Sequence, residues 1–345
     1  MQHYKRILSQ WLLPEKRKSS LGFTLMELLI AIVISSIVTS GLLYLVMELM
    51  QLDRREASID QVEQDMSRAI DYIEKDLQDA IYVYTKPQRF TTLLQDDKNF
   101  PDKVEDTPVL AFWRIDPIKS NKDPTSNEDE LPTICDPRHD DYDETDSRFE
   151  QCQSLRVRQA TSTLVIYGQR INNDDSSNWS GQSRLTRYEL TQYEDTEDLI
   201  IRPGRRDPEN LSSREDFENW TPDEDPVGLY WTLVDFVDSP TTALDRSASL
   251  NRLDLSDSES LCSNYGPEYQ VVPNAATSTT NTSFFACVRN PSASTNQDVI
   301  VFLRGSTYSG SSMSANVAGR GSTLPTLEAR VRIKGIIDKR IERSL

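Results

Sequence analysis

The sequence has few of the residues, and none of the motifs, on which enzymes commonly rely. Only two histidines occur, His3 and His139. The chain contains no GxxxxGK[ST] phosphate loop, no HExxH zinc motif and no GxSxG nucleophile motif. We therefore expect no enzymatic activity of its own.

Positive charge is also scarce, with 38 Lys and Arg against 55 Asp and Glu and a net charge of −17. Residues 1–22 carry a net charge of +4, so the 323 residues that follow carry −21. Nucleic-acid binding depends mainly on neutralising phosphates with basic side chains. The composition thus argues against a nucleic-acid partner and favours an exported, solvated domain.

Charged side chains are almost missing from residues 23–47, where Glu27 is the single exception. As a helix, these 25 residues reach about 37 Å, which is enough to cross a hydrocarbon core. The basic residues before them place the leader, residues 1–22, in the cytoplasm by the positive-inside rule. We expect a single-pass protein of the inner membrane whose remaining residues lie outside the cytoplasm.

Two features distinguish this stretch from an ordinary secretory signal. The small residue of a cleavage site, Gly22, comes before the apolar run and not after it. Glu27 places a carboxylate in the membrane segment, which costs up to about 2.5–3.5 kcal/mol at a helix centre. Such a carboxylate requires a partner.

Residues 18–30, KSSLGFTLMELLI, resemble the type III signal of type IV pilins and pseudopilins. The resemblance implies that a prepilin peptidase cleaves after Gly22 and methylates the new N-terminal amine of Phe23. It also implies that Glu27 meets the terminal ammonium of a neighbouring subunit, a pairing that is strong in low dielectric. The simpler alternative is an N-terminal membrane anchor whose acid reaches the interface.

The resemblance implies further partners, namely other major and minor pilins or pseudopilins and an inner-membrane assembly platform with its ATPase. Residues 61–84 are similar to PilW-type minor pilins and J-type minor pseudopilins. The filament is then a pilus for motility, adhesion or uptake, or a secretion pseudopilus. Within the second class, the acidic head resembles hormogonium polysaccharide secretion pseudopilins.

A function of another class is also open, a monomeric membrane-anchored protein that binds glycans or a surface. Trp179, Trp220 and Trp231 lie near polar segments and could form a sugar site, although Trp231 falls in a predicted strand.

Proline and glycine are absent between Met47 and Tyr84, so the helix is predicted to continue through residues 48–86 and to stop near Pro87. Its second half carries an apolar stripe at three- and four-residue steps, which favours packing on a sheet over a coiled coil. The stripe consists of Ile59, Val62, Met66, Ile70, Ile73, Leu77 and Ile81.

Residues 87–345 are predicted to form a β-rich head, so that the whole chain is α+β, with a long spine helix on an antiparallel sheet. Expected strands, rich in β-branched and aromatic residues, are 109–115, 163–170, 185–193, 199–202, 229–237, 284–289, 299–304 and 327–337. Long polar insertions are expected at 119–151, 172–183, 204–226 and 305–322.

All four cysteines follow the membrane segment, where an oxidising exterior permits disulfides. Sequence neighbours suggest Cys135–Cys152 and Cys262–Cys287, although four cysteines allow three connectivities. Each bond would contribute about 2–4 kcal/mol. The sequence lacks the CxxC or histidine pairs that a zinc site usually requires.

The acidic run at 140–146 offers Asp141, Asp143 and Asp146 as candidate calcium ligands. The glycine and the closing glutamate of an EF-hand loop are missing, which favours a solvated acidic segment. Calcium is the only cofactor that the sequence suggests.

Overall fold

The computed structural model describes residues 24–100, 106–118, 135, 144–146, 148–172, 179–195, 199–208, 214–240, 258–273, 283–290, 296–307 and 323–335. The chain divides into two compact units, and the boundary between Asp53 and Arg54 falls inside helix α1 (Leu25–Gln78).

The first unit contains the apolar part of α1. Its described apolar side chains are exposed, from Leu25 at 85% to Leu52 at 49%. By length and composition, α1 is apolar enough to cross a membrane. An all-round apolar surface of this kind is typical of a helix that lies in lipid or among other apolar helices.

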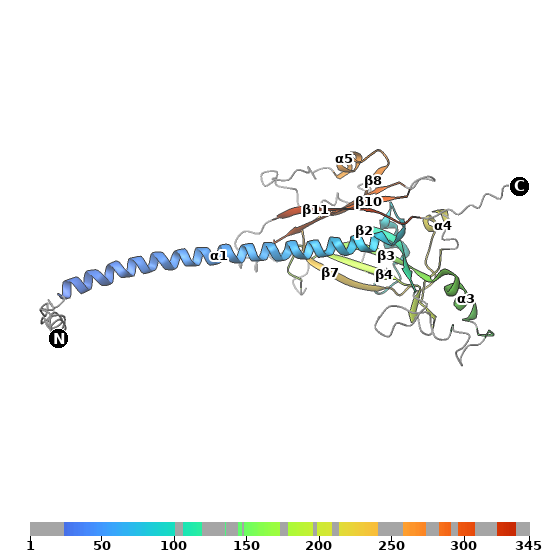
Figure 1. Ribbon diagram of the computed structural model, residues 1–345, viewed down its shortest axis with the longest axis horizontal. Helices are drawn as coiled ribbons and strands as arrows, with labels where there is room; N and C mark the ends of the chain where they lie inside the picture. Colours follow the sequence, from blue (N-terminus) through green and yellow to red (C-terminus); the bar gives the residue numbers. More distant parts are fainter. Residues whose placement is uncertain are drawn as a thin grey trace, which may run out of the picture. The chain divides into compact units, whose positions relative to one another are not determined.

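The second unit is the head, which contains a large antiparallel sheet beside the residues of α1 from Arg54 onward (Figure 1). The strand order is β1-β2-β3-β4-β7-β10-β9-β8, and β11 pairs with β10. The strands are β1 (Ala80–Val83), β2 (Asp106–Pro117), β3 (Ala160–Ile171), β4 (Ser183–Leu190), β7 (Leu229–Val237), β8 (Tyr269–Val272), β9 (Phe284–Arg289), β10 (Asp298–Ser306) and β11 (Thr323–Arg332). The predicted α+β class is confirmed.

This sheet has two well-paired parts that meet at one point. Strands β7 and β10 pair only at Val237 and Gly305, whereas β10 pairs along most of its length with β9 and β11. A separate two-stranded sheet joins β5 (Tyr193–Asp195) and β6 (Ile200–Ile201). The short helices are η1 (Pro87–Arg89), α2 (Phe90–Leu93), α3 (Phe149–Arg158), α4 (Arg214–Glu218) and α5 (Ser258–Ser263).

The largest core lies between α1 and the sheet. The predicted stripe is confirmed from Val62 to Leu77, because its members are buried against inward-facing residues such as Phe112 and Tyr167. Side chains alternate along a strand, so Trp113 belongs to a second core on the opposite face of the sheet. The sheet thus has one face covered by the helix and another covered by shorter segments.

The prediction that α1 continues to residue 86 is wrong beyond Gln78. Residues 80–83 form β1, which pairs with β2 with Tyr82 opposite Trp113. The side chains on both faces of β1 are buried. Ile81 packs in the second core and not with the helical stripe. Pairing with β2 and two-sided burial outweigh helical periodicity in these β-branched and aromatic residues.

The second core contains aromatic residues from a region expected to be a polar insertion. Phe217 from α4 stacks on Tyr82 with ring centroids 5.2 Å apart, and Trp220 packs edge-on against Trp113 at 5.3 Å. Trp220 is only 4% exposed, so it is not available for the sugar site that the sequence suggested. Residues 204–226 therefore include a cover for the sheet.

The outer edge of β1 is closed by a side chain. The amide of Gln297 accepts from the Val83 N–H at 2.9 Å and donates to the Val83 carbonyl at 2.9 Å. The Lys334 N–H donates to the Ala80 carbonyl at 3.0 Å. These bonds satisfy backbone groups that a sheet edge otherwise exposes.

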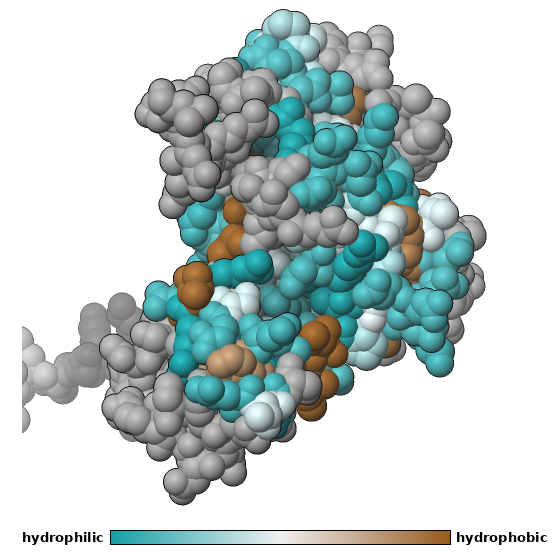
Figure 2. Space-filling view, turned by 90° about the vertical axis from the view of Figure 1, so that its right-hand side faces the viewer, coloured by the Kyte–Doolittle hydropathy of each residue, from teal (hydrophilic) through white to brown (hydrophobic). Residues whose placement is uncertain are grey.

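Viewed from the end of the head, the described surface is largely hydrophilic and carries only small separate groups of apolar side chains (Figure 2). This agrees with the strongly acidic composition of the residues after the leader.

Candidate assembly site

The described chain starts at Thr24, so the predicted cleavage residue Gly22 and the predicted N-terminus Phe23 lie outside the described residues. Thr24 immediately precedes α1, and Glu27 is in its first turn. The site is therefore described from these two residues.

Thr24 and Glu27 cap the helix reciprocally. The Glu27 N–H donates to Thr24 Oγ1 at 3.3 Å, and Glu27 Oε2 accepts from the Thr24 N–H at 3.2 Å. The Thr24 hydroxyl also donates to Oε2 at 3.2 Å. This is a capping box, which satisfies two backbone donors that the first turn leaves without partners.

The capping box leaves part of the carboxylate available. The sequence signal for a capping box, Thr-x-x-Glu before an apolar run, is present at residues 24–27, but the capping box was not predicted. Both bonds to Glu27 end on Oε2, and none of the described residues donates to Oε1. A carboxylate accepts about four hydrogen bonds, so Glu27 can cap its own helix and still receive another donor.

Polar side chains farther along the apolar helix are satisfied locally. Ser36 Oγ donates to the Val33 carbonyl at 2.8 Å, and Thr39 Oγ1 donates to the Ser35 carbonyl at 2.7 Å. Such bonds remove the cost of placing a hydroxyl in an apolar environment. The helix is continuous through Gly41.

At its other end, α1 is fastened to the sheet by a buried carboxylate, Asp76, which is 7% exposed. Asp76 Oδ1 accepts from Arg114 Nη1 at 2.6 Å. Its Oδ2 accepts from the Tyr167 hydroxyl at 2.6 Å and from Arg187 Nε at 3.0 Å. Three donors from three strands thus converge on one residue of the helix.

The rest of this cluster balances the arginine charges. Arg187, with a side chain 1% exposed, also pairs with Glu189 at 2.7 Å, and its guanidinium carbon lies 4.8 Å from the centroid of the Trp231 ring. Burial raises the pKa of Tyr167 well above its ordinary value, and the charge of Asp76 adds to the effect. Tyr167 therefore remains a neutral donor to Asp76.

The structure contains two disulfides, Cys135–Cys152 and Cys262–Cys287, with Cα–Cα distances of 5.2 and 5.3 Å. Of the three possible connectivities, this is the one suggested by pairing cysteines that are neighbours in the sequence. The second bond ties α5 to β9 in a small core around Phe285.

The residues suggested for calcium are not brought together in the described part of the chain. Asp141 and Asp143 lie outside it. Asp146 accepts from Arg148 Nη2 at 2.7 Å, which gives its carboxylate a cationic partner. No group of three potential metal ligands occurs among the described residues.

The three tryptophans suggested for a glycan site lie in different environments. Trp220 is buried in the second core, and Trp231 faces Arg187 beneath α1. Trp179 is 40% exposed, with the Arg184 guanidinium carbon 5.3 Å from its ring centroid. They do not form one binding surface.

Comparison with known proteins supports the N-terminal part of this description. Residues 17–43 match the family model described as the prokaryotic N-terminal methylation motif. The match contains Gly22, Phe23 and Glu27, so the chain carries the signal of type IV pilins and pseudopilins. No curated protein and no solved structure matches the chain.

Proposed function

We propose that this chain is a minor type IV pilin or pseudopilin subunit that is cleaved between Gly22 and Phe23 and assembled through the apolar part of α1. The methylation motif at residues 17–43 carries this proposal. It continues directly into an exposed apolar helix, and a helix-on-sheet head follows. This order suits a subunit that is held in the membrane before assembly.

The function is mechanical and requires no chemistry in the head. The apolar side chains of α1 pack against those of other subunits, and the Oε1 atom of Glu27 receives a neighbour's methylated Phe23 amine. A buried charge pair is best suited to fixing register, because either charge left alone is costly. An ATPase at the inner-membrane platform supplies the work.

The size and acidity of the head favour a minor subunit over the main repeating one. A head with several long polar insertions is difficult to repeat at every position of a tightly packed filament. We assign it to the PilW-type or J-type class, in a pilus or in a secretion pseudopilus, including one dedicated to polysaccharide export.

The mass of the N-terminal peptide from cells tests the processing step. We expect the mature chain to begin at N-methylated Phe23, and the leader to remain attached when the prepilin peptidase is deleted. A leader retained in cells that possess the peptidase would refute the proposal.

Replacement of Glu27 tests assembly against a monomeric anchor. The variant Glu27→Ala should reach the membrane but be absent from sheared filaments, whereas Glu48→Ala, on the same helix, should still be incorporated. Incorporation of Glu27→Ala at the level of Glu48→Ala would refute the role of Glu27 in assembly, whereas absence of the unmodified protein from sheared filaments would favour the monomeric glycan- or surface-binding function.

A further inference from the structure

Four aliphatic side chains on the surface of the head lie on two neighbouring segments, β6 and the residues around the start of β7. They are Ile200 and Ile201, each 50% exposed, Val227, 40% exposed, and Leu229, 41% exposed. The Val227 N–H donates to the Pro203 carbonyl at 3.2 Å, and the Val227 carbonyl accepts from Arg202 Nη1 at 3.3 Å. These bonds hold the two segments side by side, so the four residues form one surface, which we call the β6–β7 patch.

The exposure of this patch is uncommon for aliphatic residues of a strand. Successive side chains of a strand point to opposite faces, so the exposure of both Ile200 and Ile201 leaves both faces of β6 in contact with solvent. Single exposed aliphatic residues are frequent, but a contiguous group with a polar border is typical of a surface that binds another protein. The patch therefore presents aliphatic area that a partner can bury.

The backbone around the patch adopts conformations that residues with side chains rarely favour. Leu199, immediately before β6, has a φ of 54°, and Asp225 has a φ of 52°. Leu199 is nevertheless only 2% exposed and packs with Tyr193 in a small core, which offsets the strain. Gly204 also has a positive φ, 66°, and a Cβ at this position would clash with Pro226. Buried neighbours thus hold the patch in place, which reduces the cost of ordering it on binding.

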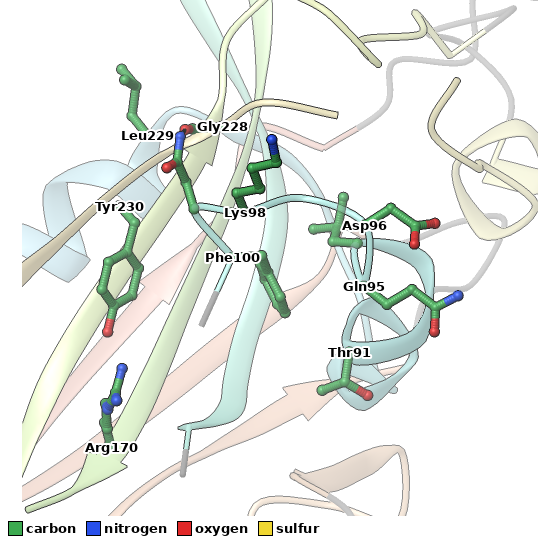
Figure 3. Close-up of a pocket in the computed structure, with 11 residues that line it drawn as sticks. Thr91, Gln95, Asp96, Lys98, Phe100, Arg170, Gly228, Leu229 and Tyr230 are labelled. Atoms are coloured by element: carbon green, nitrogen blue, oxygen red, sulfur yellow. Dashed lines mark hydrogen bonds between the residues drawn. The ribbon is translucent and has the colours of Figure 1, made fainter. Parts of the chain in front are cut away.

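The patch continues through Leu229 into a pocket of about 840 Å³, which lies between residues 91–100, the end of β3 and the start of β7 (Figure 3). The apolar residues that line this pocket are Leu94, Phe100, Leu229 and Tyr230. Its wall is fixed, because the Gly228 N–H donates to Asp97 Oδ2 at 2.7 Å and the Gly228 carbonyl accepts from Asn99 Nδ2 at 2.8 Å. A preformed pocket beside an apolar surface can receive one anchor side chain of a partner.

The border of the patch is strongly acidic. Among the described residues 193–208 and 220–229, Arg206 is the one exposed base, and the exposed acids are Glu194, Asp195, Asp207, Asp223, Glu224 and Asp225. Glu194 lies between the two β5 residues that pair with β6, and the Asp223 N–H donates to the Gly204 carbonyl at 3.0 Å, so both acids lie beside the patch. At the pocket, one exposed acid, Asp96, is balanced by one exposed base, Lys98. An aliphatic centre with an acidic border favours a basic partner.

We propose that the β6–β7 patch docks another protein, through a segment of that protein in which aliphatic side chains alternate with lysine or arginine. The aliphatic side chains cover the patch, one of them enters the pocket, and the basic side chains face the acidic border. A second copy of this chain is a poor occupant, because a symmetric contact would place the two acidic borders against each other. The surface is separate from the N-terminal motif and does not depend on filament assembly.

Fluorescence polarisation with a labelled heptapeptide, Lys-Ile-Lys-Val-Lys-Ile-Lys, tests this inference. The full-length protein is held in phosphatidylcholine nanodiscs, and empty nanodiscs supply the blank. We expect saturable binding that weakens about tenfold in Ile201→Ser, which removes aliphatic contact area, and about fivefold in Glu224→Lys, which reverses a border charge. Both side chains are exposed, so their replacement leaves the fold intact.

The matched controls are changes of the same kind at exposed positions outside the patch. Val157→Ser replaces an aliphatic residue of α3 that is 83% exposed, and Glu63→Lys reverses an exposed acid of α1. Both variants should bind the peptide as the unmodified protein does.

Two further peptides decide the chemistry of the partner. Glu-Ile-Glu-Val-Glu-Ile-Glu reverses the charges, and Lys-Ser-Lys-Ser-Lys-Ser-Lys removes the aliphatic side chains, so each should bind at least about tenfold more weakly. Absence of saturable binding, equal binding of either of these peptides, or unchanged affinity in Ile201→Ser would each overturn the proposal. A dimer of the unmodified protein that Ile201→Ser dissociates would also overturn it, by assigning the patch to a second copy.

Discussion

Removing the charge of Asp76 should weaken the attachment of α1 to the sheet. In Asp76→Asn, the carboxylate that accepts from Arg114, Tyr167 and Arg187 becomes a neutral amide. Breaking a buried ion pair by changing one partner costs about 3–5 kcal/mol, because the remaining charge stays buried. Arg187 keeps Glu189 as a partner.

Because Arg114 likewise keeps Asp116, at 2.6 Å, we take the lower end of that range, about 3 kcal/mol. For a domain of this size, such a loss lowers the melting temperature by roughly 6–12 °C. The measurement is guanidinium unfolding of the full-length protein in detergent, followed by tryptophan fluorescence. Trp231 is a suitable reporter because its ring contacts Arg187.

The matched control is Asp71→Asn, an exposed acid on the same helix, which should unfold within about 0.5 kcal/mol of the unmodified protein. A loss below about 1 kcal/mol in Asp76→Asn, or an equal loss in the control, would refute the view that this carboxylate clamps the helix.

Three further predictions concern the head. Burial raises the pKa of Asp106 from 3.8 to about 6, so the unfolding free energy should fall by about 2 kcal/mol as pH rises from 4 to 6. Asp106→Asn should remove that dependence in a pH series of denaturant melts, and an unchanged slope would contradict the assignment. Replacing Cys262 and Cys287 with serine should cost about 3 kcal/mol, and a thermal melt equal to that of the unmodified protein would disprove a stabilising bond. Gly228→Ala places a methyl group against the buried ring of Tyr188 and should lower the unfolding free energy by about 1–3 kcal/mol. An unaltered denaturation midpoint would contradict this, because it would show that the Tyr188 ring moves aside without cost.

The sequence predicted correctly those elements in which the local residue pattern favours the same structure as the strand pairing in the fold. Strands β7 and β9 occupy the predicted ranges, 229–237 and 284–289, because each is a short apolar run bounded by polar residues. The end of α1 was mispredicted because Ile81 continues the helical spacing, while its final structure depends on β2, a partner about 30 residues away.

The buried polar groups could not be predicted in the same way. Nothing local to Asp76 identifies Arg187 as its partner, since 111 residues separate them in the chain. The pocket likewise combines residues 91–100 with Arg170 and Tyr230, which meet only after the sheet has formed. The capping box of Glu27 is different, because both of its residues lie within one turn and the motif is visible in the sequence.

Gln297 has a consequence for how copies of this protein tolerate crowding. A strand with open amides and carbonyls offers a template to any similar chain nearby, and the danger grows when many copies share one membrane. By occupying both backbone groups of Val83 with its own amide, Gln297 withdraws that template. Neighbouring heads are therefore prevented from pairing along the β1 edge of the sheet.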